Sequence, residues 1–444
     1  MTVYRASPGH SLCEGFHRLD PKRGVKWKRE NLFWNQEMKE PASRPRNALI
    51  LTGGGFSGAL FEIGGLVAFD EVLGSVQPSN GFDIYVGASA GSVVASLLSL
   101  GLPARELWHT VLGESKILPP IHPHDVFGIE SPYRILRAAL RHSLRALRSL
   151  RRRGAPINFT TLLLALGENL PAGLLSIEPL RATMAEIFRR LGRSERFSSL
   201  GRELYIPAFE LDTGTRILFG ADPRRDISIP LAIAASCAIP GLFAPVAIQD
   251  SLFIDGAVGQ LTHNDIAVEA GAQTLVVFNP FVPIDNDRSA VCFTGFDGSC
   301  VTLGEKGFFY VVEQARRVSR AAKLEQETRS MPSEVTTSQL FVVQPEASEA
   351  MNFLRSPVSD RSKLESLELG YRTARRFFET HRDEIATALR KTVPPRYAAT
   401  RFPALTHYEH VGNHPRACHS GRDVGKRPRD RRLARAHRVP LVPT

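Results

Sequence analysis

The feature of the sequence that most constrains the fold is a pair of short apolar segments, each opening onto a glycine-containing turn. The first, Ala48-Leu49-Ile50-Leu51, leads to Gly53-Gly54-Gly55, and the second, Phe82-Asp83-Ile84-Tyr85-Val86, leads to Gly87-Ala88-Ser89-Ala90-Gly91. A short apolar run that ends at glycines and precedes a helix-like stretch is typical of a buried parallel strand. Two such units in succession predict an α/β fold whose mainly parallel sheet is covered by helices.

The rest of the chain extends this pattern between two polar ends. We expect further strands near residues 204–209, 216–219, 246–248, 252–254, 274–278 and 340–343, and helices near 57–73, 92–100, 229–238, 304–330 and 361–390. Residues 102–200 have a mainly helical pattern, which predicts a helical insertion or cap within one domain spanning 46–395. Residues 1–45 are predicted to be a polar, basic extension, and residues 396–444 a basic, disordered tail without an apolar period.

The charge balance points to an anionic partner. The 444 residues carry a formal net charge of +11, which favours nucleic acid or the headgroups of anionic lipid. No apolar run approaches the roughly 20 residues of a membrane-spanning helix, and residues 1–30 lack the apolar stretch of a secretory signal. The sequence therefore predicts a cytoplasmic protein with peripheral membrane contact, while export by a non-classical route stays open.

The cysteine pattern does not indicate a fold held together by disulfide bonds. The five cysteines are an odd number, are widely spread and form no C-x-x-C pair: Cys13, Cys237, Cys292, Cys300 and Cys418. We therefore expect reduced thiols, without a disulfide framework and without a zinc site. Cys237 stands among small residues and is expected to be a buried apolar residue rather than a nucleophile.

The turn after the second strand fits the pattern G-x-S-x-G. A nucleophilic serine must protrude from a sharp turn, and Gly87 and Gly91 let the backbone take that strained shape without a clash. The helix behind the turn would direct free N–H groups, and the positive end of its dipole, at the reacting centre. The pattern predicts Ser89 as a nucleophile, although a purely structural turn also fits these residues.

The glycine loop after the first strand has two interpretations. As an oxyanion hole, Gly53, Gly54 and Gly55 would turn their N–H groups toward the oxygen of an attacked ester, each worth about 3–4 kcal/mol of barrier. The loop from Gly53 to Gly58 also satisfies G-x-G-x-x-G, the fingerprint of a nucleotide-binding protein. That second interpretation is weaker, because no acidic residue stands at the end of the next strand.

Asp255 follows a short apolar strand and precedes Gly256-Ala257. Small neighbours would leave its carboxylate free to approach a substrate, and an Asx turn that merely closes a loop fits the same tripeptide. Upstream, residues 228–243 are predicted to form a small-residue helix that ends at Pro240-Gly241, for which close packing is sufficient explanation.

Taken together and in this order, these four segments resemble the patatin-like phospholipase family. The resemblance covers roughly residues 47–280 and rests on the loop from Gly53 to Gly58, the turn from Gly87 to Gly91, Ser236 to Pro240, and Asp255 to Ala257. It implies a three-layer α/β/α fold and a dyad of Ser89 and Asp255 that hydrolyses acyl esters of lipids. Two departures bear on substrate choice: Ser57 stands where the family often has Arg or Lys, and no Asn-x-Pro follows the aspartate.

In the mechanism that this resemblance implies, Asp255 takes the proton of Ser89 as an acyl-enzyme forms, and the same carboxylate then activates water. No metal or cofactor is required. A triad that adds His263 as the base is the rival within hydrolases, although His263 could equally be a surface residue at a helix start.

His122 and His124 beside Asp125 suggest a metal site, but a proline-rich loop without a further nearby ligand is the preferred explanation.

A basic amphipathic helix is predicted in the segment that begins at Arg134 and ends at Arg153. Its leucines recur at helical spacing beside rows of arginine, which suits either an anionic membrane surface or ordinary packing against the core. We expect a lipid ester substrate and no nucleic-acid partner, because the basic runs contain few aromatic residues for stacking. An acyltransferase on the same dyad and a nucleotide-binding protein using Gly53 to Gly58 remain the alternatives.

Overall fold

The computed structural model describes residues 46–129, 172–221, 226–260, 262–287, 289, 292–295, 297–329, 339–354 and 360–390. The predicted extension 1–45, the predicted tail 396–444 and the basic helix between Arg134 and Arg153 lie outside these residues, as does the middle of the predicted cap.

The centre of the fold is an eight-stranded, mostly parallel sheet, as predicted. Its order is β12 (Gln339–Val343), β9 (Ala272–Phe278), β1 (Arg46–Leu51), β2 (Ile84–Gly87), β5 (Glu203–Glu210), β8 (Ser251–Ile254) and β7 (Val246–Ile248), with β6 (Arg216–Phe219) paired to β5. The pairs from β12 through β5 are parallel, whereas β6, β7 and β8 join as antiparallel hairpin strands. The central strands β9, β1 and β2 consist mainly of apolar residues and are largely buried on both faces, which is typical of parallel strands.

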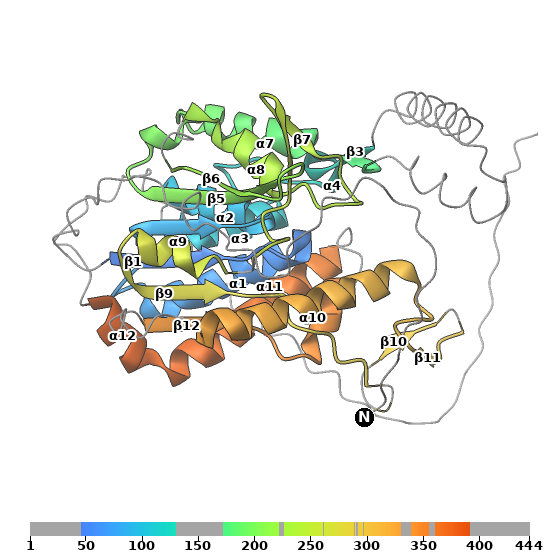
Figure 1. Ribbon diagram of the computed structural model, residues 1–444. Helices are drawn as coiled ribbons and strands as arrows, with labels where there is room; N and C mark the ends of the chain where they lie inside the picture. The colour runs from blue at the N-terminus through green and yellow to red at the C-terminus, as the bar shows by residue number, and fades with distance from the viewer. Residues whose placement is uncertain are drawn as a thin grey trace, which may run out of the picture. The chain divides into compact units, whose positions relative to one another are not determined.

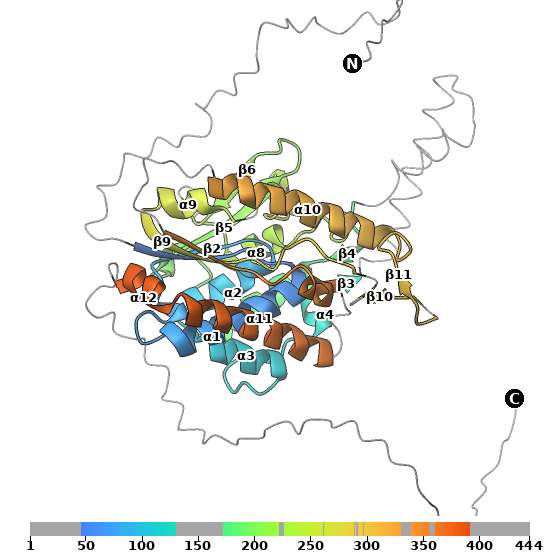
Figure 2. The ribbon, with the colours of Figure 1, turned by 90° about the horizontal axis from the view of Figure 1, so that it is seen from below.

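Helices cover both faces of this sheet (Figures 1 and 2). One face carries α1 (Gly55–Leu73), α2 (Ala90–Ser99), α3 (Ala104–Leu112) and α11 (Asp360–Thr380), and the other carries α9 (Asn264–Glu269) and α10 (Phe308–Arg329). The remaining helices are α4 (Pro123–Val126), α7 (Glu178–Arg190), α8 (Ile229–Ser236) and α12 (Arg382–Arg390). The described part therefore has the predicted three-layer α/β/α architecture.

Glycines allow α1 to pack unusually close to α11. A Cβ atom at Gly64 would lie 1.9 Å from the Leu367 carbonyl oxygen, and one at Gly370 would lie 2.0 Å from that of Phe61. Only glycine therefore fits at these two crossing points. The close contact anchors α1, whose first residues follow the glycine loop.

Parts of the sequence interpretation need correction. The helix expected over 361–390 is two helices, because α11 ends at Thr380 and α12 begins at Arg382. Within the described part of the predicted cap, α3 and α4 precede and α7 follows a short antiparallel pair of β3 (Gly128–Ile129) and β4 (Leu175–Ser176). Among the described residues, no helix combines the length and the apolar character needed to cross a membrane.

The expectation of reduced thiols is wrong for two of the cysteines. Cys292 and Cys300 form a disulfide with their Cα atoms 5.6 Å apart. The short antiparallel pair of β10 (Phe293–Thr294) and β11 (Cys300–Val301) brings them together, which eight-residue sequence spacing alone did not reveal. Cys237 is buried and free, as predicted, and burial raises the pKa of its thiol.

Candidate active site

The predicted site residues converge at the carboxyl ends of neighbouring parallel strands. Gly53 follows β1, Ser89 follows β2, and Pro280 follows β9 on the other side of β1. The strand order reverses here, since α1 leads from β1 to β2 whereas α9 and β9 lie on the opposite side of β1. In open α/β sheets, ligands bind in the crevice outside the carboxyl ends of strands at such a reversal.

Ser89 occupies a strained turn between β2 and α2. Its φ is 52° and its ψ is −134°, a conformation that L-residues rarely adopt and that a nucleophile at a sharp strand-to-helix turn requires. The flanking glycines are needed for space, because a Cβ at Gly91 would lie 2.3 Å from the Leu51 carbonyl oxygen and one at Gly87 would lie 2.6 Å from the Ser92 Cα. The turn thus presses against the end of β1.

Ser89 and Asp255 lie in direct contact although 166 positions separate them. The Ser89 hydroxyl donates to Asp255 Oδ2 at 2.6 Å, and both residues are almost fully buried, at 3% and 1% exposure. The other carboxylate oxygen, Oδ1, accepts from the Ala257 N–H at 2.7 Å. The carboxylate is therefore held in one orientation with one oxygen on the serine.

The end of α8 ties the two residues together. Ser236 Oγ accepts a hydrogen bond from the Ser89 N–H at 2.9 Å, and the Ser236 carbonyl oxygen accepts from the Gly256 N–H at 3.2 Å. A Cβ at Gly256 would lie 2.1 Å from the Pro207 carbonyl oxygen, so glycine is required beside the aspartate. The small-residue segment, which the sequence explained by close packing alone, also fixes the distance between Ser89 and Asp255.

Burial dominates the electrostatics of Asp255. Loss of water raises the pKa of its carboxyl, while the charge of Arg320 is the largest opposing effect and the hydrogen bond from Ser89 the next. A raised pKa makes a carboxylate a stronger base. The surroundings of Asp255 therefore make its carboxylate a stronger base than that of an ordinary aspartate.

The sequence suggested the N–H groups of Gly53, Gly54 and Gly55 as donors to the oxyanion, but the structure leaves fewer of them free. The Gly53 N–H donates to Glu62 Oε1 at 2.7 Å, so this amide is already engaged. Gly54 is the N-cap of α1, and the first amides of α1, beginning at Gly55, have no acceptor within the helix. A Cβ at Gly55 would meet nothing within 4 Å, so there is open space beside this residue.

Glu62 is a site residue that sequence reasoning missed. It is fully buried, and its Oε2 atom has no hydrogen-bond partner among the described residues. Burial raises the pKa of Glu62 well above its ordinary value, against the smaller opposing effect of the Gly53 hydrogen bond. The available signal was a single acidic residue within the apolar stretch from Ala59 to Phe69.

His263, the rival base, is neither on the surface nor directed at the serine. It is fully buried at the N-cap of α9, with Nε2 3.1 Å from the Gly256 carbonyl oxygen and Nδ1 3.3 Å from Arg216 Nη1. Burial, followed by the charge of Arg216, lowers the pKa of His263 to about 3. A neutral imidazole here braces the residue after Asp255.

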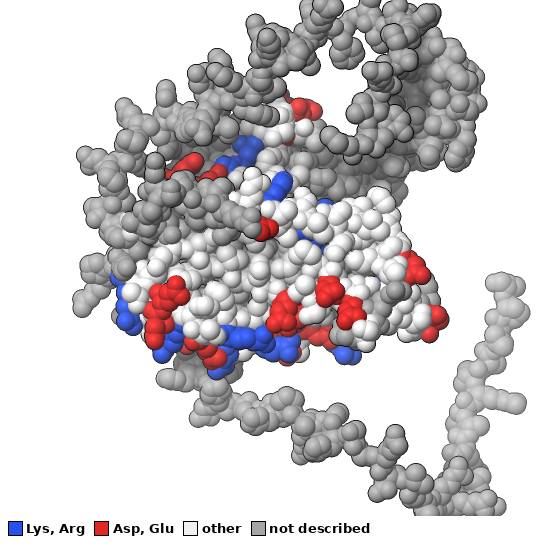
Figure 3. Space-filling model, turned by 60° about the horizontal axis from the view of Figure 1, so that its bottom comes forward, with Lys and Arg blue, Asp and Glu red and all other residues white. Residues whose placement is uncertain are grey.

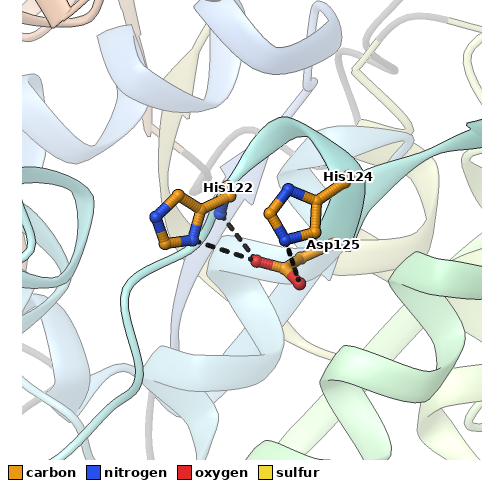
Figure 4. Close-up of side chains that lie close together, drawn as sticks. All are labelled: His122, His124 and Asp125. Carbon is orange, nitrogen blue, oxygen red and sulfur yellow. Dashed lines mark hydrogen bonds and ion pairs between the residues drawn. The ribbon is translucent and has the colours of Figure 1, made fainter.

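The candidate metal ligands lie elsewhere, on an exposed turn (Figure 4). Ligand atoms of His122, His124 and Asp125 fall within 4.8 Å of one another. Both carboxylate oxygens of Asp125 already face ring nitrogens, at 3.4 Å and 3.5 Å, and one accepts from the His122 N–H at 2.8 Å. These contacts explain the cluster without a metal, so the expectation of no metal there stays a prediction.

Comparison with known proteins points to one family. Its sequence profile, described as Patatin-like phospholipase, matches residues 49–262. A cGAMP-activated phospholipase of Escherichia coli (strain TW11681) is 26% identical over 229 residues, which cover 48% of this chain and 53% of that protein. The chain thus spans about half the length of this curated relative.

Solved structures of low similarity were also found. VipD from Legionella pneumophila has a TM-score of 0.33 at 13% identity, covering 76% of this chain and 67% of that one. Human GIVD cytosolic phospholipase A2 has a TM-score of 0.35 at 13% identity, covering 82% of this chain and 62% of that one.

Proposed function

Because residues 49–262 match the patatin-like phospholipase profile, we propose that the protein hydrolyses lipid acyl esters through Ser89, with Asp255 as its general base. The observation that carries the proposal is the buried 2.6 Å hydrogen bond from the Ser89 hydroxyl to Asp255 Oδ2. The sheet and α8 hold the two groups at this distance before any substrate arrives, which removes the entropic cost of bringing them together.

In the first half of the reaction, Ser89 Oγ attacks the carbonyl carbon of the ester while Asp255 accepts its proton. The tetrahedral oxyanion collapses, the bond to the alcohol oxygen breaks, and the protonated Asp255 returns its proton to that leaving oxygen. In the second half, water gives a proton to Asp255 and attacks the acyl-enzyme, which releases the fatty acid and restores Ser89.

The oxyanion would be held by backbone amides rather than by a cation or a metal. The contact between Gly53 and Glu62 narrows the donors of the glycine loop to the amides of Gly54 and Gly55. The dipoles of α1 and α2 both point their positive ends at this place, because each helix begins within two residues of the site. Donors of this kind are worth about 3–4 kcal/mol each.

Contact with a lipid surface is supported by the outer face of α10. This face consists of the exposed residues between 308 and 322, none of them charged: Phe308, Phe309, Val311, Val312, Ala315, Val318, Ser319 and Ala322. Figure 3 views this side of the molecule and shows uncharged residues over most of its described part, with charged residues gathered along the lower edge. An exposed apolar face on a chain of net charge +11 fits an anionic membrane.

The test compares the wild-type protein with Ser89→Ala and Asp255→Asn on a short-chain chromogenic ester and on phospholipid vesicles. Each variant is expected to lose at least roughly 10⁴-fold in kcat. Ser96→Ala and Asp70→Asn are matched controls, because Ser96 is buried, Asp70 is half-buried, and both are hydrogen-bonded away from the site. Folded Ser89→Ala protein that keeps its turnover on both substrates would sink the proposal.

A further inference from the structure

The inner face of α10 is charged, the reverse of the usual pattern for a surface helix. Glu313, Arg317 and Arg320 are buried on it, at 8%, 2% and 4% exposure. Buried charges are costly unless they are paired and hydrogen-bonded, so each of these residues needs a partner that compensates for its lost hydration.

Arg317 has such partners and is structural. Its guanidinium donates to Glu313 Oε1 at 3.1 Å and to the carbonyl oxygens of Pro280 and Val282 at 3.3 Å and 3.0 Å. These contacts hold α10 against the segment that follows β9. A cation with three acceptors is satisfied within the fold.

Arg320, one turn further along, is not satisfied. Its Nη1 atom is buried and has no hydrogen-bond partner among the described residues. Its guanidinium carbon lies 3.8 Å from the ring centroid of Phe281, which holds it by a cation–π contact without using its N–H donors. Burial and the charge of Arg316 lower the pKa of Arg320 to about 10, so the side chain remains a cation at neutral pH.

The charge of this cation acts on the carboxyl group of Asp255. Phe281, on which it stacks, has a ring atom 3.6 Å from where a Gly54 Cβ would be. Lys323, three residues after Arg320, donates to the Gly259 carbonyl oxygen at 2.6 Å, in the loop that begins at Asp255. The turn of α10 that carries Arg320 therefore bridges the glycine loop and the aspartate loop.

We propose that Arg320 is a binding site for the phosphate group of a phospholipid substrate, held beside Ser89 and the glycine loop. The proposal rests on the proposed function. A planar guanidinium with an unpaired donor at Nη1 matches the oxygens of a phosphodiester, and charge-assisted contacts of this kind are the strong ones. In a glycerophospholipid the phosphate is a few bonds from the acyl ester, so a cation next to the oxyanion loop can hold one while Ser89 attacks the other.

The experiment compares two substrates that differ in the phosphate. Phosphatidylglycerol in mixed micelles with a neutral, phosphate-free detergent carries it, and diacylglycerol of the same acyl chains in the same micelles does not. Arg320→Met is expected to lower kcat/KM for the phospholipid roughly 10- to 100-fold while that for diacylglycerol changes less than about threefold. Arg320→Lys should recover part of the loss, since it restores the charge without the planar donors.

Arg316→Met is the matched control. Arg316 is on the same helix and its charge also acts on Asp255, but its side chain is paired with Glu313 at 3.2 Å. Its removal should change both substrates alike. An equal fall on both substrates for Arg320→Met, or no fall on either, would overturn the proposal, because Arg320 would then act only through Asp255 or not at all.

Two further measurements keep the outcome decisive. A glycerol phosphate ester should inhibit the wild-type protein more strongly than glycerol does, and this requires no variant that must fold. Inorganic phosphate could instead compete with both substrates while the Arg320→Met variant keeps its preference for the phospholipid. That result would mean that the site binds a free anion, and it would overturn the lipid assignment. Wild-type protein that hydrolyses neither substrate would instead sink the proposed function.

Discussion

The carboxyl group of Glu62 accepts the N–H of Gly53 at 2.7 Å, and Gly53 in turn lies against the nucleophile turn. A Cβ at Gly53 would come within 2.5 Å of the Ala88 carbonyl oxygen and 3.0 Å of the Ser89 Cβ. A buried acid on α1 is therefore connected to Ser89 through a single peptide. The Glu62 carboxyl holds the Gly53 amide toward α1, and the amides of Gly54 and Gly55 remain for the oxyanion.

Replacing Glu62 tests this connection. Glu62→Gln keeps an acceptor for the Gly53 N–H, so kcat should stay within about threefold, whereas Glu62→Leu should lower kcat roughly tenfold with little change in KM, since a buried donor is left unpaired. Steady-state kinetics on the chromogenic ester measure both. Equal activity of the two variants would mean that the acceptor does not position the loop.

The raised pKa of Glu62 adds a pH dependence. Its carboxyl is neutral below that pKa, and ionisation above it places a negative charge behind the amides that stabilise the oxyanion. The kcat of the wild-type protein should therefore fall as the pH rises through that pKa, and the fall should be absent in Glu62→Gln. The same fall of kcat with rising pH in both proteins would assign the fall to another group.

The raised pKa of Asp255 should have opposite effects on catalytic activity and on the stability of the fold. Catalysis requires its ionised form, so the raised pKa moves the acid limb of kcat/KM above the value near 3.9 of an exposed aspartate. Because the folded pKa exceeds the unfolded one, the fold is favoured below the unfolded pKa and loses that advantage as the pH rises through the folded pKa.

Asp255→Asn removes the buried charge and should therefore melt at a higher temperature than the wild-type protein at pH 7, although it has no turnover. The gain should shrink as the pH falls toward 4. Thermal unfolding at several pH values measures this difference, with Ser96→Ala, which removes no titrating group, as a control outside the site. A lower melting temperature at pH 7 would contradict the cost that we assign to the buried carboxylate.

His263→Ala separates a dyad from a triad. The imidazole contacts Gly256 and Arg216, so the dyad predicts that kcat per folded molecule stays within about threefold, whereas loss of a general base costs roughly 10²–10⁴-fold. The measurement is kcat normalised to the folded fraction. A collapse of kcat in folded protein would support the triad.

His263 should also affect acid stability. Since its folded pKa of about 3 lies below the unfolded value near 6.5, its contribution is complete above pH 6.5 and is lost as the pH falls toward 3. His263→Ala should therefore lose less stability than the wild-type protein between these pH values. Denaturant unfolding at pH 7 and pH 4.5 provides the comparison.

The outer face of α10 predicts where the protein meets lipid. Phe308 and Phe309 are 84% and 59% exposed, and changing both to Ser should weaken binding to anionic vesicles by roughly tenfold or more, because each ring buries apolar area in the interface. Turnover of a dissolved short-chain ester should not change. Leu112→Ser on α3, on the opposite helical layer (Figure 2), is the control and should bind vesicles normally.

Two other results of the same experiment would contradict the lipid assignment. Unchanged vesicle sedimentation of the Phe308 and Phe309 variant would show that this face does not meet the bilayer. A concentration-dependent dimer of the wild-type protein that these changes dissociate would mean that a second copy, rather than lipid, covers the face.

The sequence by itself determined the sheet and the order of the segments that build the site. Short apolar runs, glycine turns and small-residue helices are local patterns, and a parallel sheet places the turns after β1 and β2 at one edge whatever the rest of the chain does. The location of Ser89 and the three-layer fold could therefore be predicted without knowing any distance between segments that lie far apart in the sequence.

Only the tertiary structure decided which groups face one another there. Whether Gly53 offers its amide to a substrate depends on Glu62 across the α1 packing, and whether His263 is exposed depends on Arg216 and the residues that bury it. Arg320 gained its position beside Asp255 because α10 crosses the sheet 65 positions later in the chain, and the Cys292–Cys300 disulfide arose from a short hairpin. Such contacts depend on distances between segments far apart in sequence, and no local periodicity encodes those distances.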